Sequence, residues 1–490
     1  MKVERLSKKI KPKPSYPERI LQIGEGNFLR GFIDWQIHKL NEETDFKGSA
    51  VVVSPRRGSV VQAINEQDGL YTLYLEGFQE GREIRDSVVI RSISRGISSY
   101  DQYDEFMAVA DQPELRFIFS NTTEAGIVFM EEDRLSDRPQ ESFPGKLTAL
   151  LYRRYQTFHG SEEKGFVILP CELIEDNGEK LKDIVLQYAD LWKLEKGFID
   201  WLEHANVFCN TLVDRIVPGF PKDKALELEK AAGYRDSLIV TAEPYHLFVI
   251  DGPDWLQEEL PFQKAGLNVL FVNDVTPYRE RKVRILNGAH TAMTPVAYLA
   301  GHDTVQEAAA DELVGQFVKD LLKHEVIPTI ELPENQLQTY MEEILDRFRN
   351  PFIRHQLLDI SLNSFSKFKI RNLPVMREHI NKNGKLPERT VFALSALIYF
   401  YKGKRGHSPI PLADDADTLS FLKRLWEDET DPAEIARRVL ESETLWGENL
   451  NEWPDLAAKL AGHLDGIMQN GMKEALKKLI NSQMAELGDR

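Results

Sequence analysis

Short apolar runs of strand length dominate the first half of the chain. They lie at residues 20–23, 50–53, 116–120 and 165–170. Residues 28–40 and 146–155 lie between them and repeat apolar positions at helical spacing, so the pattern predicts a doubly wound α/β domain. Residues 71–77 and 87–98 alternate instead, which indicates an antiparallel insert. Residues 241–252 and 267–274 are expected to complete this domain as further strands.

Helical periodicity takes over from about residue 277. The expected helices lie at residues 305–324, 337–349, 352–366, 389–401, 418–426, 433–440 and 455–487. A chain of 490 residues also exceeds what one core usually supports. The sequence therefore predicts an α/β domain over residues 1–275 and a mostly α-helical domain over residues 276–490.

A glycine turn follows the first strand and opens the first helix. Gly24-Glu25-Gly26 would let the backbone approach a pyrophosphate at the helix N-terminus, which predicts a Rossmann-like dinucleotide-binding domain. Leu29 stands where the third glycine of the usual fingerprint would fall, so the turn alone is a weak signal. Residues 121–126 follow the strand at 116–120, at the sheet edge where such folds bind ligands, although a plain polar turn is the alternative.

The end of the second strand carries no acidic residue. NAD-binding folds often place an Asp or Glu there for the ribose hydroxyls. Arg56 and Arg57 occupy this region instead, and two arginines would permit the 2′-phosphate of NADP. An exposed basic turn explains them equally well, so the residues alone leave the cofactor open.

Three polar residues stand at fixed offsets in residues 276–301. At about 100° per residue, Asn287 falls near 140° and His290 near 80° from Lys282, so all three can face one cavity. A desolvated Lys beside Arg281 and Arg284 can exchange a proton with an alkoxide, an Asn amide can stabilise that oxygen, and an imidazole can hold a substrate hydroxyl. This set suits carbonyl reduction. A solvated basic helix start followed by a polar helix face remains the alternative.

These motifs together resemble a known family. The spacing K-x4-N-x2-H at Lys282, Asn287 and His290 and the string G-x-G-N-F-x-R-G from Gly24 are similar to those of the mannitol dehydrogenase family of polyol-specific long-chain dehydrogenases. The resemblance implies a metal-independent oxidoreductase that uses NAD, whereas the arginines keep NADP open. Within the family, residues 280–292 are similar in sequence to those of members that act on sugar acids. This similarity implies reversible reduction of D-tagaturonate to D-altronate in hexuronate catabolism. Fructuronate reduction or mannitol-type polyol oxidation is the alternative.

The resemblance also assigns roles to residues. It makes Lys282, Asn287 and His290 catalytic. It places the cofactor on Ile23, Gly24, Glu25, Gly26, Asn27, Phe28, Arg30, Asn121, Thr122, Thr123 and Glu124.

The chain departs from the polyol enzymes at two places. Leu173 replaces a family Asn that helps hold the substrate oxygen, so what supplies that second amide is open. A helix over residues 352–366 would align His355, Asp359 and Asn363 on one face, with Lys367 next, and this face could line a substrate pocket. Lys367 would then meet the carboxylate of a sugar acid. The alternative is a row of polar side chains on a solvated helix surface. Asp214 is a further candidate for the site wall, although an Asp-Arg pair before a proline more often fixes a loop. His246 is expected to be a buried strand residue.

The composition of the chain limits the classes of partner that it is expected to bind. A net charge of −17 argues against nucleic acid or an anionic membrane, so a sugar-acid substrate would need a local cationic pocket. Two cysteines suit a reducing compartment, and residues 1–17 read as a solvated basic arm without an apolar leader. We therefore expect a soluble cytoplasmic enzyme with a small-molecule substrate, and the oligomeric state stays open.

Overall fold

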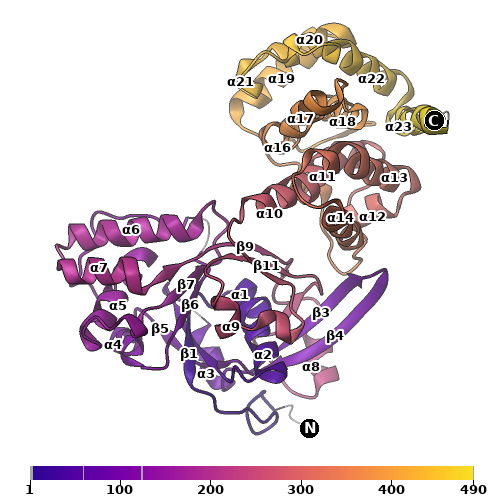
Figure 1. Ribbon diagram of the computed structural model, residues 1–490. Helices are drawn as coiled ribbons and strands as arrows, with labels where there is room; N and C mark the ends of the chain where they lie inside the picture. Colours follow the sequence, from indigo (N-terminus) through magenta and orange to yellow (C-terminus); the bar gives the residue numbers. More distant parts are fainter. Residues whose placement is uncertain (1–3, 59, 123–124, 489–490) are drawn as a thin grey trace. The chain divides into compact units, whose positions relative to one another are not determined.

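The structure is a computed structural model that describes residues 4–58, 60–122 and 125–488. The chain divides into two compact units. Figure 1 labels their helices and strands along the ribbon. Unit 1 comprises Met1–Glu76 and Glu83–Val275, and unit 2 comprises Gly77–Arg82 and Thr276–Arg490.

A six-stranded sheet forms the centre of unit 1. Its strand order is β5-β2-β1-β6-β7-β8, and every neighbouring pair is parallel. This is the doubly wound order in which two βαβ halves diverge from the first strand, so the predicted Rossmann-like fold is confirmed. The strands are β1 (Glu18–Ile23), β2 (Ser49–Ser54), β5 (Ile93–Ser98), β6 (Phe117–Ser120), β7 (Val167–Pro170) and β8 (Val207–Phe208).

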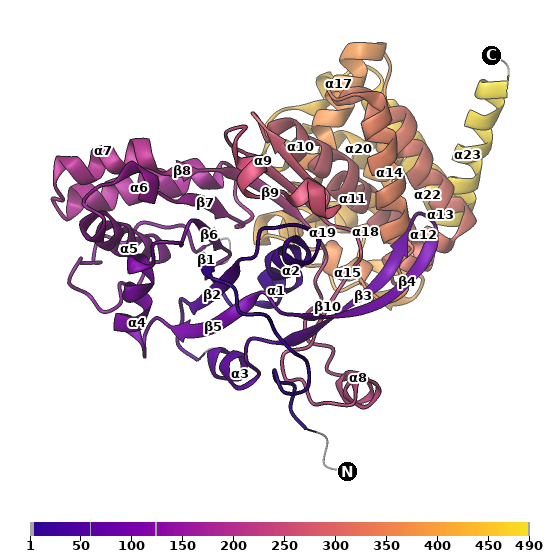
Figure 2. The same cartoon turned by 60° about the horizontal axis from the view of Figure 1, so that its bottom comes forward.

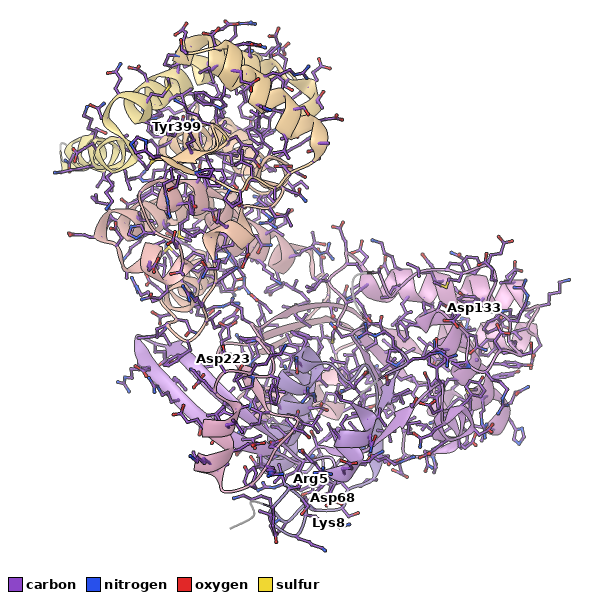
Figure 3. The ribbon with its side chains drawn as sticks, turned by 180° about the vertical axis from the view of Figure 1, so that it is seen from behind. Arg5, Lys8, Asp68, Asp133, Asp223 and Tyr399 are labelled. Carbon is purple, nitrogen blue, oxygen red and sulfur yellow. The ribbon has the colours of Figure 1, made fainter. Side chains whose placement is uncertain are left out.

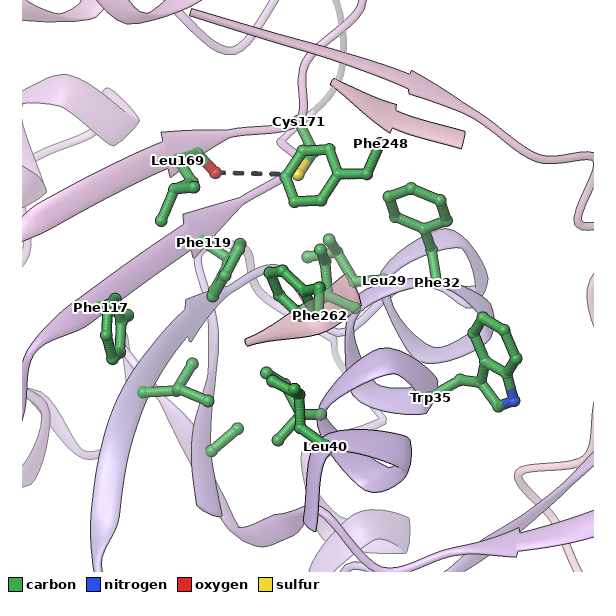
Figure 4. Close-up of a cluster of buried hydrophobic side chains, with 14 of the residues drawn as sticks. Leu29, Phe32, Trp35, Leu40, Phe117, Phe119, Leu169, Cys171, Phe248 and Phe262 are labelled. Carbon is green, nitrogen blue, oxygen red and sulfur yellow. Dashed lines mark hydrogen bonds between the residues drawn. The ribbon is translucent and has the colours of Figure 1, made fainter. Parts of the chain in front are cut away.

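Two apolar cores cover the faces of this sheet. On one face lie α5 (Phe143–Thr157), α6 (Asn177–Leu191) and α7 (Lys196–Ala205). On the other lie α1 (Asn27–Gly31), α2 (Ile33–Glu43) and β11 (Leu247–Asp251). Figure 4 shows how rings from these elements interlock: Phe248 lies 5.5 Å from Phe32, edge to face, and 6.4 Å from Phe119, centroid to centroid. The shorter helices of unit 1 are α3 (Val61–Glu66), α4 (Tyr103–Ala108), α8 (Ala225–Ala232) and α9 (Leu256–Glu259).

The predicted antiparallel insert is right for its first half only. β3 (Tyr71–Gln79) and β4 (Arg82–Ile90) are neighbours in a three-stranded sheet with β10 (Val240–Ala242), visible in Figure 2. Glu80 and Gly81 join them with positive φ at both residues, as a two-residue hairpin turn requires. Residues 93–98, expected in the same insert, instead pair with β2 as a parallel strand. A third sheet has the order β12-β11-β9, with β9 (Asn210–Asp214) and β12 (Val269–Val272).

The N-terminal segment over residues 4–17 is mostly exposed, as predicted, but it is tied to unit 1 and is not a free arm. Leu6 is fully buried, and its N–H donates to the carbonyl of Arg235 at 2.8 Å. The Lys8 N–H donates to Asp68 at 2.9 Å, and Arg5 pairs with Glu66. Figure 3 shows Arg5, Lys8 and Asp68 gathered at this contact. The segment is therefore part of unit 1.

Unit 2 is mostly α-helical, as predicted. Its helices are α10 (Thr276–Arg281), α11 (Gly288–Leu299), α12 (Val305–Ala310), α13 (Glu312–Leu321), α14 (Glu334–Phe348), α15 (Leu357–Ile360), α16 (Ser364–Arg371), α17 (Leu373–Asn383), α18 (Glu388–Phe400), α19 (Ala416–Asp428), α20 (Pro432–Glu441), α21 (Glu443–Trp446), α22 (Leu456–Asn470) and α23 (Met472–Gly488). The helix expected over residues 305–324 is interrupted at Asp311, whose side chain caps the new helix by accepting from the N–H groups of Leu313 and Val314. In the described part of the chain, none of the helices has the length and apolar character needed to cross a membrane.

Candidate active site

The glycine turn of unit 1 combines one glycine required by packing with one that faces open space. Gly24 has φ +119°, and a Cβ there would lie 2.8 Å from the carbonyl oxygen of Asn121. Its N–H donates to Val53 at 2.9 Å, which ties the turn to β2. Gly26 precedes α1, and a Cβ there would meet no protein atom within 4 Å. The turn therefore fits a group that approaches the backbone closely, such as a pyrophosphate.

Arg30 holds this turn in shape. Its buried guanidinium donates to the Glu25 carbonyl at 3.2 Å, to Asn27 Oδ1 at 2.7 Å and to the Leu238 carbonyl at 2.5 Å. Burial lowers its pKa below the ordinary arginine value. Since these donors point at the protein, the structure gives Arg30 a positioning role for its neighbours in the predicted cofactor set. Phe28, also in that set, stacks on Phe32 at 5.1 Å.

The loop after β6 is fixed by a buried carboxylate. Asn121 donates its N–H to Ile23 at 3.1 Å and its side-chain amide to the Cys171 carbonyl at 2.7 Å. Glu172 accepts from the N–H and hydroxyl of Thr122 at 2.9 and 3.0 Å, and burial raises its pKa. These contacts bring the residue 121–122 loop against the glycine turn at the carboxyl end of the sheet. Thr123 and Glu124, also predicted to bind the cofactor, lie outside the described residues.

Leu173, which stands where the polyol enzymes carry an Asn, is 58% exposed. The nearby Asn177 amide is buried and donates to the carbonyls of Pro170 and Glu172 at 3.0 and 3.1 Å. Asn177 therefore fixes its own loop. The group that would replace the second amide stays unassigned.

Asp214 and Arg215 lie buried at the end of β9. Arg215 donates to the carbonyls of Glu243 and Gly31, both at 2.8 Å, and its guanidinium lies 4.2 Å from the Trp35 ring centroid. These contacts favour the loop-fixing interpretation of the pair. His246 is half-buried and directly precedes β11, so the prediction of a buried residue inside a strand is wrong in both respects. Its Nε2 accepts from the Asn268 N–H at 2.9 Å, and burial lowers its pKa to about 3.

The helix that carries Lys282, Asn287 and His290 changes its winding at these residues. Lys282–Asn287 is a π-helix between α10 and α11, so the estimate of 100° per residue is wrong for this segment. Hydrogen bonds of a π-helix join residues i and i+5, and this wider turn places Asn287 one turn above Lys282. The structure thus aligns the two side chains better than an α-helix would, and π-turns occur frequently at functional sites. Residues 282–299 are called the signature helix below.

Neighbouring contacts hold the π-turn in place. Arg284 donates to the Thr329 carbonyl at 2.6 Å and pairs with Glu280 at 3.2 Å. Arg281 is buried, and its guanidinium lies 4.2 Å from the Tyr340 ring centroid. Both arginines therefore have partners of their own. Lys282 and Asn287 are half-buried.

His290 lies in a small aromatic group. Its ring stacks on Phe348 at 4.4 Å and meets His355 edge to face at 5.2 Å. Burial lowers the pKa of His355, with Asp359 acting in the opposite direction. The structure thus brings the predicted substrate residue His355 next to the predicted catalytic residue His290.

The other members of the expected pocket wall do not share a helical face with His355. The helix predicted over residues 352–366 is wrong: His355 precedes α15, and Asn363 adopts a left-handed φ of +54° between α15 and α16. Asparagine tolerates this conformation, and Asn363 is the N-cap residue of α16. Lys367 donates to the Ile360 carbonyl at 2.9 Å, and burial followed by the Arg371 charge lowers its pKa.

Sequence reasoning missed two residues that reach the signature helix. Arg371 donates to the Thr291 hydroxyl at 3.1 Å, and the Asn372 amide donates to the Gly288 carbonyl at 3.1 Å. The apolar spacing that includes Phe365 continues at Phe368 and Leu373, past residue 366 where the predicted helix ends. This spacing was the sequence signal that helical structure extends to Arg371 and Asn372.

Comparisons with known proteins agree with this arrangement. Residues 18–264 match the model of the mannitol dehydrogenase Rossmann domain, and residues 274–468 match that of the mannitol dehydrogenase C-terminal domain. The chain belongs to the mannitol dehydrogenase family. The family resemblance predicted from the motifs is thereby confirmed.

Individual relatives cover nearly the whole chain. An altronate oxidoreductase of Bacillus subtilis (strain 168) is 54% identical over 464 residues, which cover 94% of this chain and 95% of the relative. An altronate oxidoreductase of Escherichia coli (strain K12) is 48% identical over 473 residues, covering 96% and 98%. This family member is therefore an oxidoreductase acting on a CH–OH group, of the sugar-acid and polyol dehydrogenase class.

Two solved structures share the family fold. A substrate-free D-sorbitol dehydrogenase aligns with a TM-score of 0.81 at 21% identity and covers 96% of this chain and 100% of its own. A Pseudomonas fluorescens mannitol 2-dehydrogenase in a ternary complex with NAD and D-mannitol aligns with a TM-score of 0.67 at 24% identity, covering 98% and 97%. Both support the fold assignment.

Alanine substitution of Gly24 and of Gly26 separates a role in stability from a role in cofactor binding. We expect Gly24→Ala to lower the free energy of unfolding by about 1–3 kcal/mol, because φ is positive and the Cβ meets the Asn121 carbonyl. Gly26→Ala should unfold like the wild-type protein yet bind NADH at least about tenfold more weakly, because only a ligand approaches that position. Thermal unfolding and NADH fluorescence titration measure both effects.

Gly462→Ala is the matched control, since its Cβ also meets open space but lies on α22. Unchanged NADH affinity in the Gly26 variant would contradict the cofactor site at this turn.

Proposed function

We propose that the protein catalyses the reversible, NAD-dependent reduction of D-tagaturonate to D-altronate. The observation that carries the proposal is 54% identity over nearly full length to an altronate oxidoreductase. The π-turn that aligns Lys282 with Asn287 supports it independently, because carbonyl reduction needs a proton donor and an amide on the same oxygen.

The three polar residues of the signature helix have different proposed roles in the reaction. The cofactor, when bound, supplies or accepts the hydride. Lys282 gives a proton to the oxygen of the substrate ketone in reduction and takes it back in oxidation. The Asn287 amide donates to the same oxygen and stabilises the charge that develops there. His290, held by Phe348 and His355, orients a substrate hydroxyl. We propose that these groups replace the electrophilic help that a metal ion gives elsewhere.

The neighbourhood of β2 favours NAD over NADP. β2 ends at Ser54, whose hydroxyl donates to Glu25 Oε1 at 3.0 Å. Glu25 thus supplies, from the glycine turn, a carboxylate at the strand end where dinucleotide folds bind the ribose hydroxyls. Its negative charge would repel a 2′-phosphate. Arg56 is exposed, and Arg57 stacks 4.4 Å from the Tyr100 ring centroid.

NADH oxidation at 340 nm tests the substrate. We expect fast turnover with D-tagaturonate and NADH, and slower turnover with D-fructuronate, D-fructose or NADPH in its place. Preference for D-fructuronate would reassign the substrate within the sugar acids. Preference for D-fructose would make the chain a polyol enzyme and overturn the proposal.

Removal of the Lys282 amine tests its role. We expect Lys282→Ala to lower kcat with D-tagaturonate by about 10²–10⁴-fold, because positioned proton transfer contributes that much. NADH affinity should stay unchanged, because the proposed role of Lys282 is proton transfer to the substrate, whereas the cofactor is assigned to the glycine turn. Lys423→Ala removes an exposed lysine from unit 2 as the control. A Lys282 variant that keeps more than a tenth of wild-type kcat would contradict the assigned role.

Neutralisation of Glu25 tests the cofactor choice. Glu25→Gln keeps the size of the side chain but removes the charge at the end of β2. We expect the ratio of kcat/KM for NADPH to that for NADH to rise about tenfold, since repulsion of the 2′-phosphate is lost. Glu163→Gln, an exposed change elsewhere in unit 1, should leave the ratio unchanged. An unchanged ratio in the Glu25 variant would remove this carboxylate from cofactor selection.

A further inference from the structure

Arg371, the last residue of α16, reaches the same face of the signature helix as Asn287. Its Nη1 donates to the Thr291 hydroxyl at 3.1 Å, and that hydroxyl donates to the Asn287 carbonyl at 2.9 Å. Residues four apart in an α-helix lie one above the other, so Thr291 stands one turn from Asn287. The guanidinium therefore lies about one helical turn from the amide assigned to the substrate ketone.

Arg154 and Arg30 are buried arginines that use several donors on protein groups. Arg154 donates to four backbone carbonyls, those of Lys164, Ala110, Gln112 and Leu115, at 2.5–3.0 Å. Arg30 similarly uses three donors. A guanidinium presents five N–H donors, and buried donors are normally satisfied. Within residues 4–58, 60–122 and 125–488, by contrast, a single hydroxyl accepts from half-buried Arg371.

No carboxylate of the described residues balances this charge. Burial lowers the pKa of Arg371 and no acidic neighbour opposes it. The neighbouring cation Lys367 is committed elsewhere, because it donates to the Ile360 carbonyl at 2.9 Å. A half-buried fork without an anion is the geometry that binds a carboxylate through two parallel hydrogen bonds.

We propose that Arg371 binds the carboxylate of the sugar-acid substrate and thereby selects acids over neutral ketoses. The inference rests on the proposed function and names the group in it that recognises the acid. In a six-carbon keto acid such as D-tagaturonate, four carbon–carbon bonds separate the ketone carbon from the carboxylate carbon, about 5 Å when extended. One helical turn rises about 5.4 Å, so Asn287 and Arg371 are spaced for the two ends of such a molecule. The site also supplies the local cation that a chain of net charge −17 needs for an anionic substrate.

Steady-state kinetics of two variants test the assignment. Arg371→Gln removes the charge, and we expect KM for D-tagaturonate to rise about 10- to 100-fold, with kcat falling less than KM rises. Arg371→Lys keeps the charge but loses the planar fork, so its KM should fall between those of the wild type and the Gln variant. This second variant keeps the test valid if the first does not fold. NADH affinity and melting temperature should match the wild type in each variant assayed.

Lys369→Gln removes one positive charge from the same helix and should change KM less than twofold. A KM within twofold of wild type in the Arg371 variants would overturn the inference. Parallel losses of kcat, NADH affinity and melting temperature in Arg371→Lys would overturn it too, because they would show a structural role. Failure of the proposed function is seen beforehand in the wild-type protein, as absent turnover of every hexulosonate. If the wild type prefers D-fructuronate, the variants are assayed with that acid, since the inference requires only the carboxylate.

Discussion

A local change in helix winding sets the spacing on which the proposed chemistry depends. In an α-helix Lys282 and Asn287 would point about 140° apart, whereas the π-turn over Lys282–Asn287 places them one above the other. Such a turn is rare and occurs mostly as a single turn inside an α-helix. Contacts outside the helix stabilise it: Arg284 reaches the Thr329 carbonyl on one side, and Asn372 reaches the Gly288 carbonyl just past the π-turn. The surrounding helices thus determine where the two side chains point.

In unit 1, close backbone packing sets the conformation of the glycine turn. The turn at Gly24 passes so close to Asn121 that a side chain would not fit, and this brings the ends of β1 and β6 together. Arg30 and Glu172 then fix the turn and the facing loop through hydrogen bonds to backbone groups. Both groups are buried, so these hydrogen bonds are shielded from water and hold the turn and the loop in the conformation seen here.

The sequence predicted the parts of the molecule that follow from periodicity. The strand–glycine turn–helix unit, the doubly wound sheet and the helical second part all appear as expected, because apolar spacing reports which face is buried. Periodicity cannot report a change of winding, so the π-turn was not foreseen. Periodicity also predicted one continuous helix over residues 352–366, although Asn363 adopts a left-handed backbone conformation that interrupts it. Arg371 escaped notice because its importance lies in which partners it lacks, and these are visible only in three dimensions.

The position of α11 has a consequence for how this enzyme can change. All but two of its twelve residues, His290 and Leu299, are buried, and it packs against α13, α15, α16 and α18. A substitution on α11 therefore disturbs the centre of the helical unit as well as any chemistry that the helix performs. α15 and α16 are short, partly exposed and joined by an irregular turn, where replacements disturb less packing. Under the proposed roles, divergence in substrate preference is thus structurally easier than divergence in reaction type. A single scaffold can in this way serve several sugars and sugar acids while the reacting groups stay in place.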